Sequence, residues 1–277
     1  MKTLNLVGCG RVGQTLARLW HLQNTFVIQD VLTTSMASAH AACNFIGTGR
    51  AVEKLQAMRP ADFWLIATPD AQLAQMAAAL AVHVRGMPPA LAFHSSGALG
   101  AVQLAPLTAL GWQTASAHCI LSFSSSATAV AQFAGTPCAL EGEAQACAVL
   151  KTAFTAIGAR CFDLASEQKL LYHAAAVFAT NFLPVLQVVA EDAWRSTGVP
   201  ADLIADLRVS LLNNAVANIS RLGPAAALTG PAARGDLDAI DRQARVVSAW
   251  DKEAGAAYEA LSALALRIAV LRAVKSD

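Results

Sequence analysis

Short runs of apolar and β-branched residues alternate with helical stretches over roughly the first 165 residues. The runs that predict strands span residues 4–7, 26–32, 63–67, 90–93, 113–117, 138–140 and 160–164. Between the first two runs, Val12, Leu16, Leu19 and Trp20 recur at the spacing of one helix face. Strands that alternate with amphipathic helices predict an α/β fold with a parallel sheet covered by helices.

After residue 165 the β-branched runs stop, and alanine- and leucine-rich helical periodicity takes over. The pattern therefore predicts a sheet domain over residues 1–165 and an all-α domain over residues 166–277. The most apolar stretch, AAAVFATNFLPVLQVVA from Ala174, contains four polar or helix-breaking residues and is of marginal length for crossing a bilayer. We expect this stretch to be a buried helix and the protein to have no membrane partner.

Composition narrows the classes of function. Hydrophobic residues make up 55% of the chain and charged residues 14%, well below the usual charged share of about 25%, which predicts a sizeable subunit interface. The net charge of +1 and the lack of a basic run argue against nucleic-acid binding. Because the first predicted strand begins almost at Met1 with no apolar segment before it, we expect no secretory signal. The six cysteines show neither CxxC pairs nor zinc spacing. We expect a cytoplasmic protein without disulfides or a bound metal.

The segment GCGRVG carries three glycines, Gly8, Gly10 and Gly13, with the spacing GxGxxG. It follows a predicted strand and opens a predicted helix, and a second strand follows within about 30 residues, which is the setting of a dinucleotide-binding loop. Gly8 would allow a tight turn, Gly10 the approach of a pyrophosphate, and Gly13 close packing of helix and strand. The residues expected to bind the dinucleotide here are Gly8, Cys9, Gly10, Arg11, Val12 and Gly13. The alternative is a turn that binds nothing.

The 2′ position of such a cofactor is recognised near the end of the second strand. Asp30 lies inside that predicted strand, and the residues beyond it are Thr33, Thr34 and Ser35. Hydroxyl side chains would admit a 2′-phosphate, so the sequence favours NADP, with NAD as an alternative. Asp30 would contact the ribose instead if the strand ended earlier.

Residues that follow the other strands are candidates for the ligand site, because ligands bind beyond the carboxyl ends of parallel strands. Thr68, Pro69 and Asp70 follow the third strand and are expected to line the cofactor pocket, although Asp70 could simply begin a helix. His94, Ser95, Ser96 and Gly97 follow the fourth strand and His118 follows the fifth. These five are the expected substrate contacts, and structural histidines are the alternative.

Two polar groups interrupt the helical half. Lys169, His173 and Asn181 can share one helix face, and Pro184 should kink or interrupt that helix. Such a polar row is either a satisfied core network or a substrate site. Further along, Thr229 and Arg234 could bind a substrate carboxylate. The alternative there is a turn followed by an N-cap at Asp236.

Together, the segments VGCGRVG, ATPD, FHSSGAL, YHAAAVFATN and LGPAAALTGPAARGD resemble the NAD(P)-dependent oxidoreductases that join a Rossmann-like domain to a C-terminal helical domain of uncharacterised function. The wider kin of that family include pyrroline-5-carboxylate reductase and the 6-phosphogluconate and 3-hydroxyisobutyrate dehydrogenases. The resemblance implies a 6-phosphogluconate dehydrogenase-like helical domain, a homodimer formed through that domain, and a substrate loop at residues 95–97. It places Lys169 and His173 where the dehydrogenases have a Lys-x-x-x-Asn pair, with histidine replacing the asparagine.

These observations lead to one main hypothesis, in which hydride moves between NADP(H) and a small carbonyl, hydroxy acid or imine. His173 is the expected proton donor, since an imidazole titrates near neutral pH, with Lys169 in reserve. Asn181 and Ser96 would orient the substrate. The alternatives are a regulatory protein that binds NAD(P) without turnover and a methyltransferase that uses adenosylmethionine.

Overall fold

The computed structural model describes residues 1–274 and divides them into two compact units. The first unit is Met1–Phe178, and the second begins at Ala179. The sheet of the first unit ends at Asp163, so this unit also includes the first helix of the predicted helical region. Every candidate site residue that follows a strand lies in the first unit.

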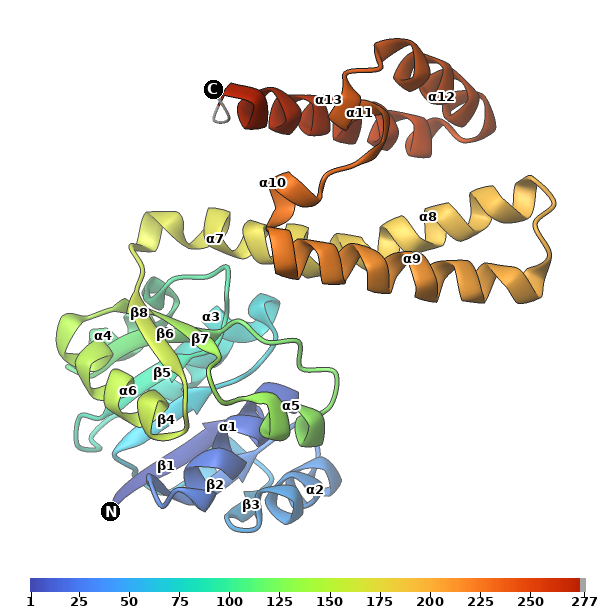
Figure 1. Ribbon diagram of the computed structural model, residues 1–277. Coiled ribbons are helices and arrows are strands. Elements are labelled where there is room, and N and C mark those ends of the chain that lie inside the picture. Colours follow the sequence, from blue (N-terminus) through green and yellow to red (C-terminus); the bar gives the residue numbers. More distant parts are fainter. Residues whose placement is uncertain (275–277) are drawn as a thin grey trace. The chain divides into compact units, whose positions relative to one another are not determined.

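The first unit is built on one eight-stranded sheet, shown with its labels in Figure 1. The strand order is β3-β2-β1-β4-β5-β6-β7-β8. The strands are β1 (Lys2–Val7), β2 (Phe26–Leu32), β3 (Arg50–Val52), β4 (Phe63–Ile66), β5 (Leu91–His94), β6 (Gln113–Cys119), β7 (Pro137–Gly142) and β8 (Arg160–Asp163). The seven predicted strands are confirmed. β3 was missed because three residues are too few to show a periodic pattern.

The predicted parallel sheet covered by helices is confirmed, and it contains one antiparallel pairing. β6 and β7 run antiparallel, with Cys119 opposite Cys138, while all other neighbouring strands are parallel. The connection between them contains only the short helix α5 (Ser126–Gln132). It begins and ends at the same edge of the sheet, the one where β6 ends. Because it stays at that edge, this connection can contribute to a site beyond the carboxyl ends of the parallel strands.

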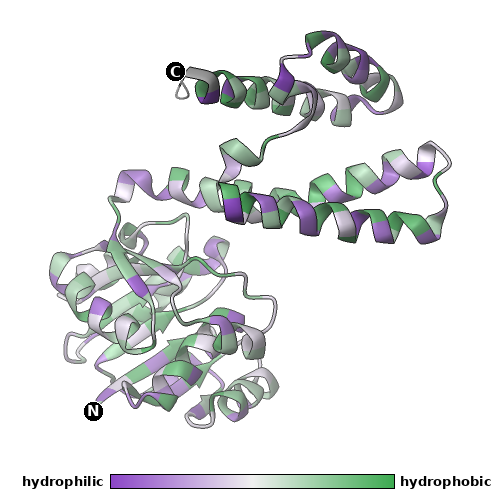
Figure 2. Cartoon of the chain, viewed as in Figure 1, coloured by the Kyte–Doolittle hydropathy of each residue, from purple (hydrophilic) through white to green (hydrophobic). Residues whose placement is uncertain are grey.

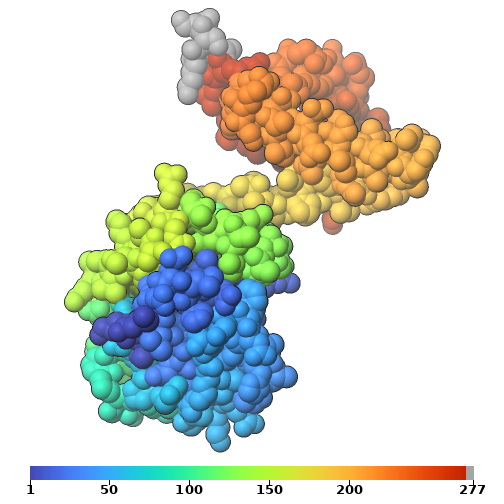
Figure 3. Space-filling view, turned by 60° about the horizontal axis from the view of Figure 1, so that its bottom comes forward, coloured from blue at the N-terminus to red at the C-terminus, as the bar shows by residue number. Residues whose placement is uncertain are grey.

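Helices cover both faces of the sheet, each over its own hydrophobic core. On one face, α1 (Arg11–Leu22), α2 (Met36–Ile46) and α6 (Ala144–Ala156) pack around the fully buried Trp20. The indole of Trp20 makes edge contacts with Phe26, Phe93 and Phe154, and its N–H donates to the carbonyl of Ala153. On the other face, α3 (Asp70–His83), the 3-10 helix η2 (Ala101–Leu104) and α4 (Ala105–Thr108) cover Trp64. Figure 3 shows the N-terminal segments of this unit, in blue, closely packed against later ones.

Among residues 1–274, the remainder of the chain contributes only helices and the loops between them. Its elements are η1 (Leu55–Ala57) and η3 (Ser166–Gln168) in the first unit, α7 (Lys169–Ala176), the π-helix η4 (Val177–Asn181), α8 (Phe182–Ser196), α9 (Ala201–Leu222), α10 (Pro224–Ala227), α11 (Gly230–Arg234), α12 (Leu237–Trp250) and α13 (Lys252–Val274). Within the second unit α8 packs on α9, and α11 and α12 pack on α13. The predicted interruption at Pro184 is confirmed as the π-helical turn just before it, since proline cannot donate to the carbonyl four residues back.

The expectation that the apolar stretch after Ala174 is buried is wrong for the single chain. Two helical stretches, Ser166–Ser196 and Lys252–Arg272, are long and apolar enough to cross a membrane by length and composition, a test that helices of soluble proteins also pass. In the most apolar 18-residue window of the first stretch, no residue is buried within the chain. Figure 2 shows hydrophobic residues along these helices as well as inside the sheet.

Candidate functional site

The glycine loop after β1 has the geometry that its sequence predicts. Gly8 has a φ of 81°, and a Cβ added there would lie 2.7 Å from the carbonyl oxygen of Ala67, so only glycine fits. Gly13 packs against the carbonyl of Gly8, where an added Cβ would be 3.3 Å from that oxygen. A Cβ on Gly10 would meet nothing within 4 Å. Gly10 also begins α1 without a side-chain cap, so the first amides of the helix face open space that an anion could occupy.

This loop forms one wall of a cavity of about 1010 Å³, at the upper end of the range for small-molecule sites. The cavity lies beyond the carboxyl ends of the parallel strands. Its wall includes the predicted residues Gly8, Cys9, Gly10, Arg11, Val12, Gly13, Thr33, Thr34, Thr68, Pro69, Asp70, Ser95, Ser96, Gly97 and His173. Thr68 is part of this wall, and within residues 1–274 its buried hydroxyl has no hydrogen-bond partner.

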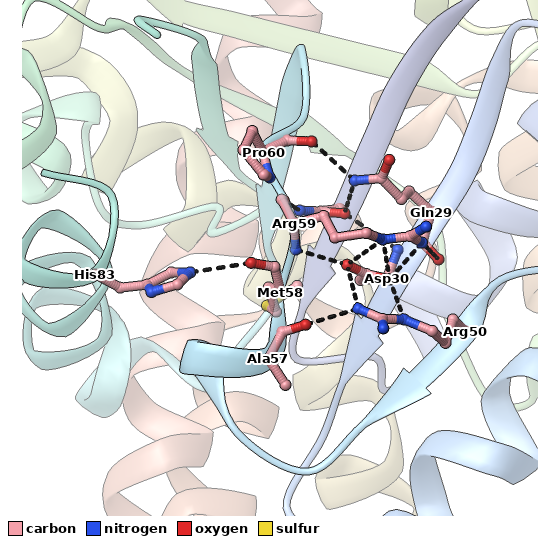
Figure 4. Close-up of polar contacts among 9 residues, drawn as sticks. Gln29, Asp30, Arg50, Ala57, Met58, Arg59, Pro60 and His83 are labelled. Atoms are coloured by element: carbon pink, nitrogen blue, oxygen red, sulfur yellow. Dashed lines mark hydrogen bonds and ion pairs between the residues drawn. The ribbon is translucent and has the colours of Figure 1, made fainter. Parts of the chain in front are cut away.

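Asp30 does not face this cavity. β2 continues to Leu32, and the carboxylate of Asp30 is buried between two arginines that approach from β3 and from the end of η1 (Figure 4). Arg50 Nε lies 2.8 Å and Arg59 Nη2 lies 2.7 Å from Oδ1, and the amide of Arg59 donates to Oδ2 at 2.8 Å. Burial alone would raise the pKa of Asp30, but these hydrogen bonds outweigh it and hold the pKa below the usual value. The reading in which Asp30 contacts the ribose is therefore wrong.

The hydroxyls after β2 are partly engaged within the chain. Ser35 does not line the cavity, because it is the N-cap of α2 and its Oγ accepts the amide of Ser38 at 3.2 Å. Thr33 lines the cavity and donates to the carbonyl of Ser35 at 2.9 Å. Thr34 is exposed at the wall. Of the three predicted residues, only the two threonines remain candidates for contact with a cofactor.

Asp70 both lines the cavity and begins a helix. It is the first residue of α3, where a carboxylate interacts favourably with the helix dipole. It also accepts a hydrogen bond of 2.8 Å from the hydroxyl of Ser96, which in turn accepts the amide of Leu99 at 3.0 Å. This bridge ties the loop after β5 to the helix after β4, so that Ser95, Ser96 and Gly97 form the end of the cavity opposite Thr33.

His94 is fully buried and does not line the cavity, contrary to its predicted role as a substrate contact. Its Nδ1 accepts the amide of Ser96 at 3.2 Å, so the proton must be on Nε2, which lies 3.1 Å from the carbonyl of Gly100. Burial lowers the pKa of His94 to about 4. This neutral imidazole holds the loop from Ser96 to Gly100 in place.

His118 and His173 converge on Gly97. A Cβ added to Gly97 would lie 2.4 Å from His173 Nδ1 and 2.7 Å from His118 Nε2, so a glycine is required where the loop passes the two rings. His118 Nδ1 lies 3.1 Å from the hydroxyl of Tyr172, and burial, followed by the charge of Lys169, lowers the pKa of His118 to about 4. His173 lines the cavity, and its buried Nδ1 has no hydrogen-bond partner among the residues described. Of these two rings, that of His173 is the one that lines the cavity.

Lys169 is buried behind the loop rather than exposed in the cavity wall. Its ammonium donates to the hydroxyl of Ser116 at 2.7 Å and to the carbonyl of Ser96 at 3.2 Å. Burial lowers its pKa, and the carboxylates of Glu141 and Asp70 partly oppose that shift. Lys169 thus contacts and positions the loop around Ser96. The sequence had suggested that it contacts the substrate directly.

Three predicted residues belong to the second unit. Asn181 ends the π-helical turn, so a regular helix face does not extend to it from Lys169. Thr229 is the N-cap of α11 and Arg234 is the last residue of that helix. Asp236 caps α12 by accepting the amide of Ala239 at 3.0 Å, which confirms the turn and N-cap considered as the alternative reading. The roles of Asn181, Thr229 and Arg234 in a substrate site stay predictions.

The cavity wall also contains residues that the sequence analysis missed. They are Gln14, Leu32, Ser38, Glu53, Lys54, Gln72, Met76 and Phe123, among others. Glu53 and Lys54 were missed with the short strand β3 that positions them. Phe123 was missed because the antiparallel turn after β6 was not expected. No group of three or more histidine, cysteine or acidic residues suited to a metal occurs within the part of the chain that the structure describes.

Comparison with known proteins shows what the chain is similar to. A Rossmann-like domain model matches residues 2–119, and the model of a domain of unknown function, DUF2520, matches residues 136–265. A comparison with curated proteins gave no match.

Solved structures share the fold over nearly the whole chain. A protein from Thermotoga maritima matches with a TM-score of 0.76 and 22% identity, covering 98% of this chain and 99% of its own. A candidate NADP oxidoreductase from Bacteroides fragilis matches with a TM-score of 0.72 and 23% identity, covering 96% and 98%. An imine reductase from Myxococcus stipitatus, in complex with NAD+, matches with a TM-score of 0.60 and 15% identity, covering 100% and 94%.

Pyrroline-5-carboxylate reductases from several organisms share the same fold, one of them with NADP bound. The resemblance inferred from the sequence motifs is thereby confirmed. In its fold and in its two model matches, the chain is similar to proteins that combine a Rossmann-like domain with a DUF2520 domain.

Proposed function

We propose that this protein is an oxidoreductase that transfers a hydride between NADP(H) and a small carbonyl, hydroxy acid or imine substrate. The observation that carries the proposal is the single cavity wall that joins the glycine loop at Gly8–Gly13 to the loop at Ser95–Gly97 and the imidazole of His173. The fold neighbours named for nicotinamide-dependent reactions support the same class. When bound, the cofactor would supply the hydride, and the protein supplies binding, orientation and a proton.

The residues divide between binding and proton transfer. The amides at the start of α1 would hold the pyrophosphate, and the unpartnered hydroxyl of Thr68 would bind the cofactor further along the cavity. His173 is the proposed proton donor or acceptor, because its side chain lines the cavity and its buried Nδ1 has no hydrogen-bond partner among the residues described. Lys169 and His94 act on the substrate indirectly, by holding the loop around Ser96.

Binding and turnover test the proposal separately. We expect NADPH to raise the melting temperature of the full chain and a panel of small imines and 2-oxo acids to contain a compound that oxidises NADPH. His173→Asn should lower that turnover by about 10²-fold or more, while the exposed His40→Asn serves as the matched control. Unchanged turnover in His173→Asn would refute the assignment of the proton donor.

The outcome of the panel also separates the alternatives. Stabilisation by NADPH without any oxidation of it would favour a regulatory protein that only binds the cofactor. Stabilisation by adenosylmethionine in place of NADPH would favour a methyltransferase. Failure of every nicotinamide cofactor to bind would overturn the proposed function itself.

We further propose that the protein is a cytoplasmic homodimer formed through the helices of the second unit. The apolar side chains of α8 support the dimer, since Val188 is 60% exposed in the single chain. Six unpaired cysteines support a reducing compartment. Val188→Lys should shift sedimentation toward the monomer, whereas Val82→Lys, at a valine 69% exposed on α3 of the first unit, should not. A monomeric wild-type protein would contradict the dimer.

A further inference from the structure

The residues at the carboxyl end of β3 form a charged part of the cavity that no comparison assigns. We propose that Lys54 supplies the cation of a subsite for the 2′-phosphate of NADP, beside the hydroxyls of Thr33 and Thr34. This inference rests on the proposed function and names the residues that would select NADP over NAD. The choice between NAD and NADP is usually made by an acidic or a basic residue at the end of β2. Here the charged residue that makes this choice would lie at the end of the neighbouring strand, β3.

The register of the sheet brings these residues together. Leu32 pairs with Val52 in the parallel ladder of β2 and β3, so the next residues, Thr33 and Glu53, leave the sheet side by side. Lys54 follows directly, and Thr33, Thr34, Glu53 and Lys54 all line the cavity. The α2 helix begins just beyond Thr34, and its amino end adds a partial positive charge near the same position.

The buried carboxylate of Asp30 fixes the segment that carries Lys54. Arg50, the first residue of β3, and Arg59, just after η1, both bind this carboxylate, so the chain between them is anchored at its two ends (Figure 4). Arg50 Nη2 also donates to the carbonyl of Ala57 at 2.6 Å, so a hydrogen bond joins the two ends of this segment directly. Lys54 is thus presented to the cavity from a fixed backbone, while Asp30 itself is removed from the cofactor.

The charges in the cavity wall decide between a phosphate and a hydroxyl at the 2′ position. Arg11 and Lys54 are the arginine and lysine side chains of the wall, and Arg11 lies at the start of α1 with its guanidinium 3.4 Å from the carbonyl of Phe123. Lys54 forms no ion pair with a carboxylate among residues 1–274, so its ammonium is available. Glu53 lines the same wall and opposes a phosphate, so the preference for NADP depends on the balance of these two neighbours.

Binding of nucleotide fragments tests the subsite without any knowledge of the substrate. The probes are adenosine 2′,5′-bisphosphate against 5′-AMP, and NADPH against NADH, titrated calorimetrically into the full-length protein. Lys54→Gln should weaken the two 2′-phosphorylated ligands by about tenfold, as expected for loss of one charge-assisted hydrogen bond, and leave 5′-AMP and NADH unchanged. Glu53→Gln should strengthen the 2′-phosphorylated ligands, and Lys54→Arg should retain most of their affinity.

Arg85→Gln is the matched control, because it removes one positive charge from an exposed turn of the same unit outside the cavity wall. It should leave all four affinities unchanged. Equal weakening of NADPH and NADH by Lys54→Gln, or no effect on either, would overturn the subsite. If the wild-type protein binds NADH and NADPH equally well, the subsite is refuted while the proposed oxidoreductase function stands.

Discussion

Loss of the neutral imidazole of His94 should change how the stability of the protein depends on pH. The folded protein excludes the second proton from this buried ring, because Nδ1 already accepts the amide of Ser96 and Nε2–H faces the carbonyl of Gly100. The pKa of His94 therefore falls from 6.5 to about 4 on folding. Since the unfolded chain takes up the proton first, the stability that this group contributes is complete above pH 6.5 and is lost as the pH falls toward 4.

The size of the effect follows from these two pKa values. Linkage between protonation and folding makes the loss about 2 kcal/mol at about pH 5, and its limit at lower pH is about 3 kcal/mol. This is a large part of the stability of a typical domain. His118 adds a slope of the same sign, because burial lowers its pKa in the same direction.

Urea unfolding of the wild type and of His94→Gln at about pH 7.5 and about pH 5 measures this contribution, with fluorescence of the buried Trp20 and Trp64 as the signal. Glutamine can keep part of the hydrogen bonding but cannot be protonated. We expect the variant to be the less stable protein at the higher pH, and the difference to shrink by about 2 kcal/mol at the lower pH. The slope from His118 cancels in this comparison. A difference that stays constant with pH would refute the neutral, buried state of His94.

Three further substitutions test the geometry of the first unit. Gly8→Ala should abolish stabilisation by NADPH in a melting assay, because the added Cβ would lie 2.7 Å from the carbonyl oxygen of Ala67 at a backbone φ of 81°; a normal shift would contradict the loop assignment. Gly97→Ala should lower NADPH-dependent turnover by tenfold or more, because its Cβ would lie 2.4 Å from His173 Nδ1 and displace the imidazole. Turnover equal to that of the wild type would show that the position of the His173 imidazole does not matter for the reaction. Asp30→Asn should lower the free energy of unfolding in urea by about 2 kcal/mol, less than for a fully buried ion pair because both arginines are half exposed; an unchanged midpoint would mean that the clamp does not stabilise the fold.

Those parts of the fold that depend on local pattern were predictable from the sequence. Seven strands, the glycine loop and the interruption before Pro184 each have a signature within about ten residues, such as a β-branched run or a residue that cannot donate a hydrogen bond. The position of the cavity was predictable for a different reason. The rule that ligands bind beyond the carboxyl ends of parallel strands identified the positions after β1, β2, β4 and β5 without any knowledge of side-chain contacts.

The state of each charged side chain was not predictable, since it depends on partners that are distant in sequence. Asp30 is removed from the cofactor by Arg59, 29 residues away, and Lys169 is held behind the cavity by Ser116, 53 residues away. The periodic pattern of apolar residues contains no information about such contacts. The same holds for Lys54, whose position depends on a strand of only three residues.

These pairings also explain how the cavity can hold polar groups in a fixed arrangement without metal ligands or disulfides among the residues described. Lys169 binds the carbonyl of Ser96, His94 binds its amide, and Asp70 binds its hydroxyl, so one residue of the substrate loop is held through three different atoms. Because backbone and side chain are both fixed, His173 can approach Gly97 closely without the loop moving away. The polar side chains that look catalytic in the sequence therefore act mainly on the loop. The imidazole that lines the cavity is that of His173, and its buried Nδ1 has no hydrogen-bond partner within residues 1–274.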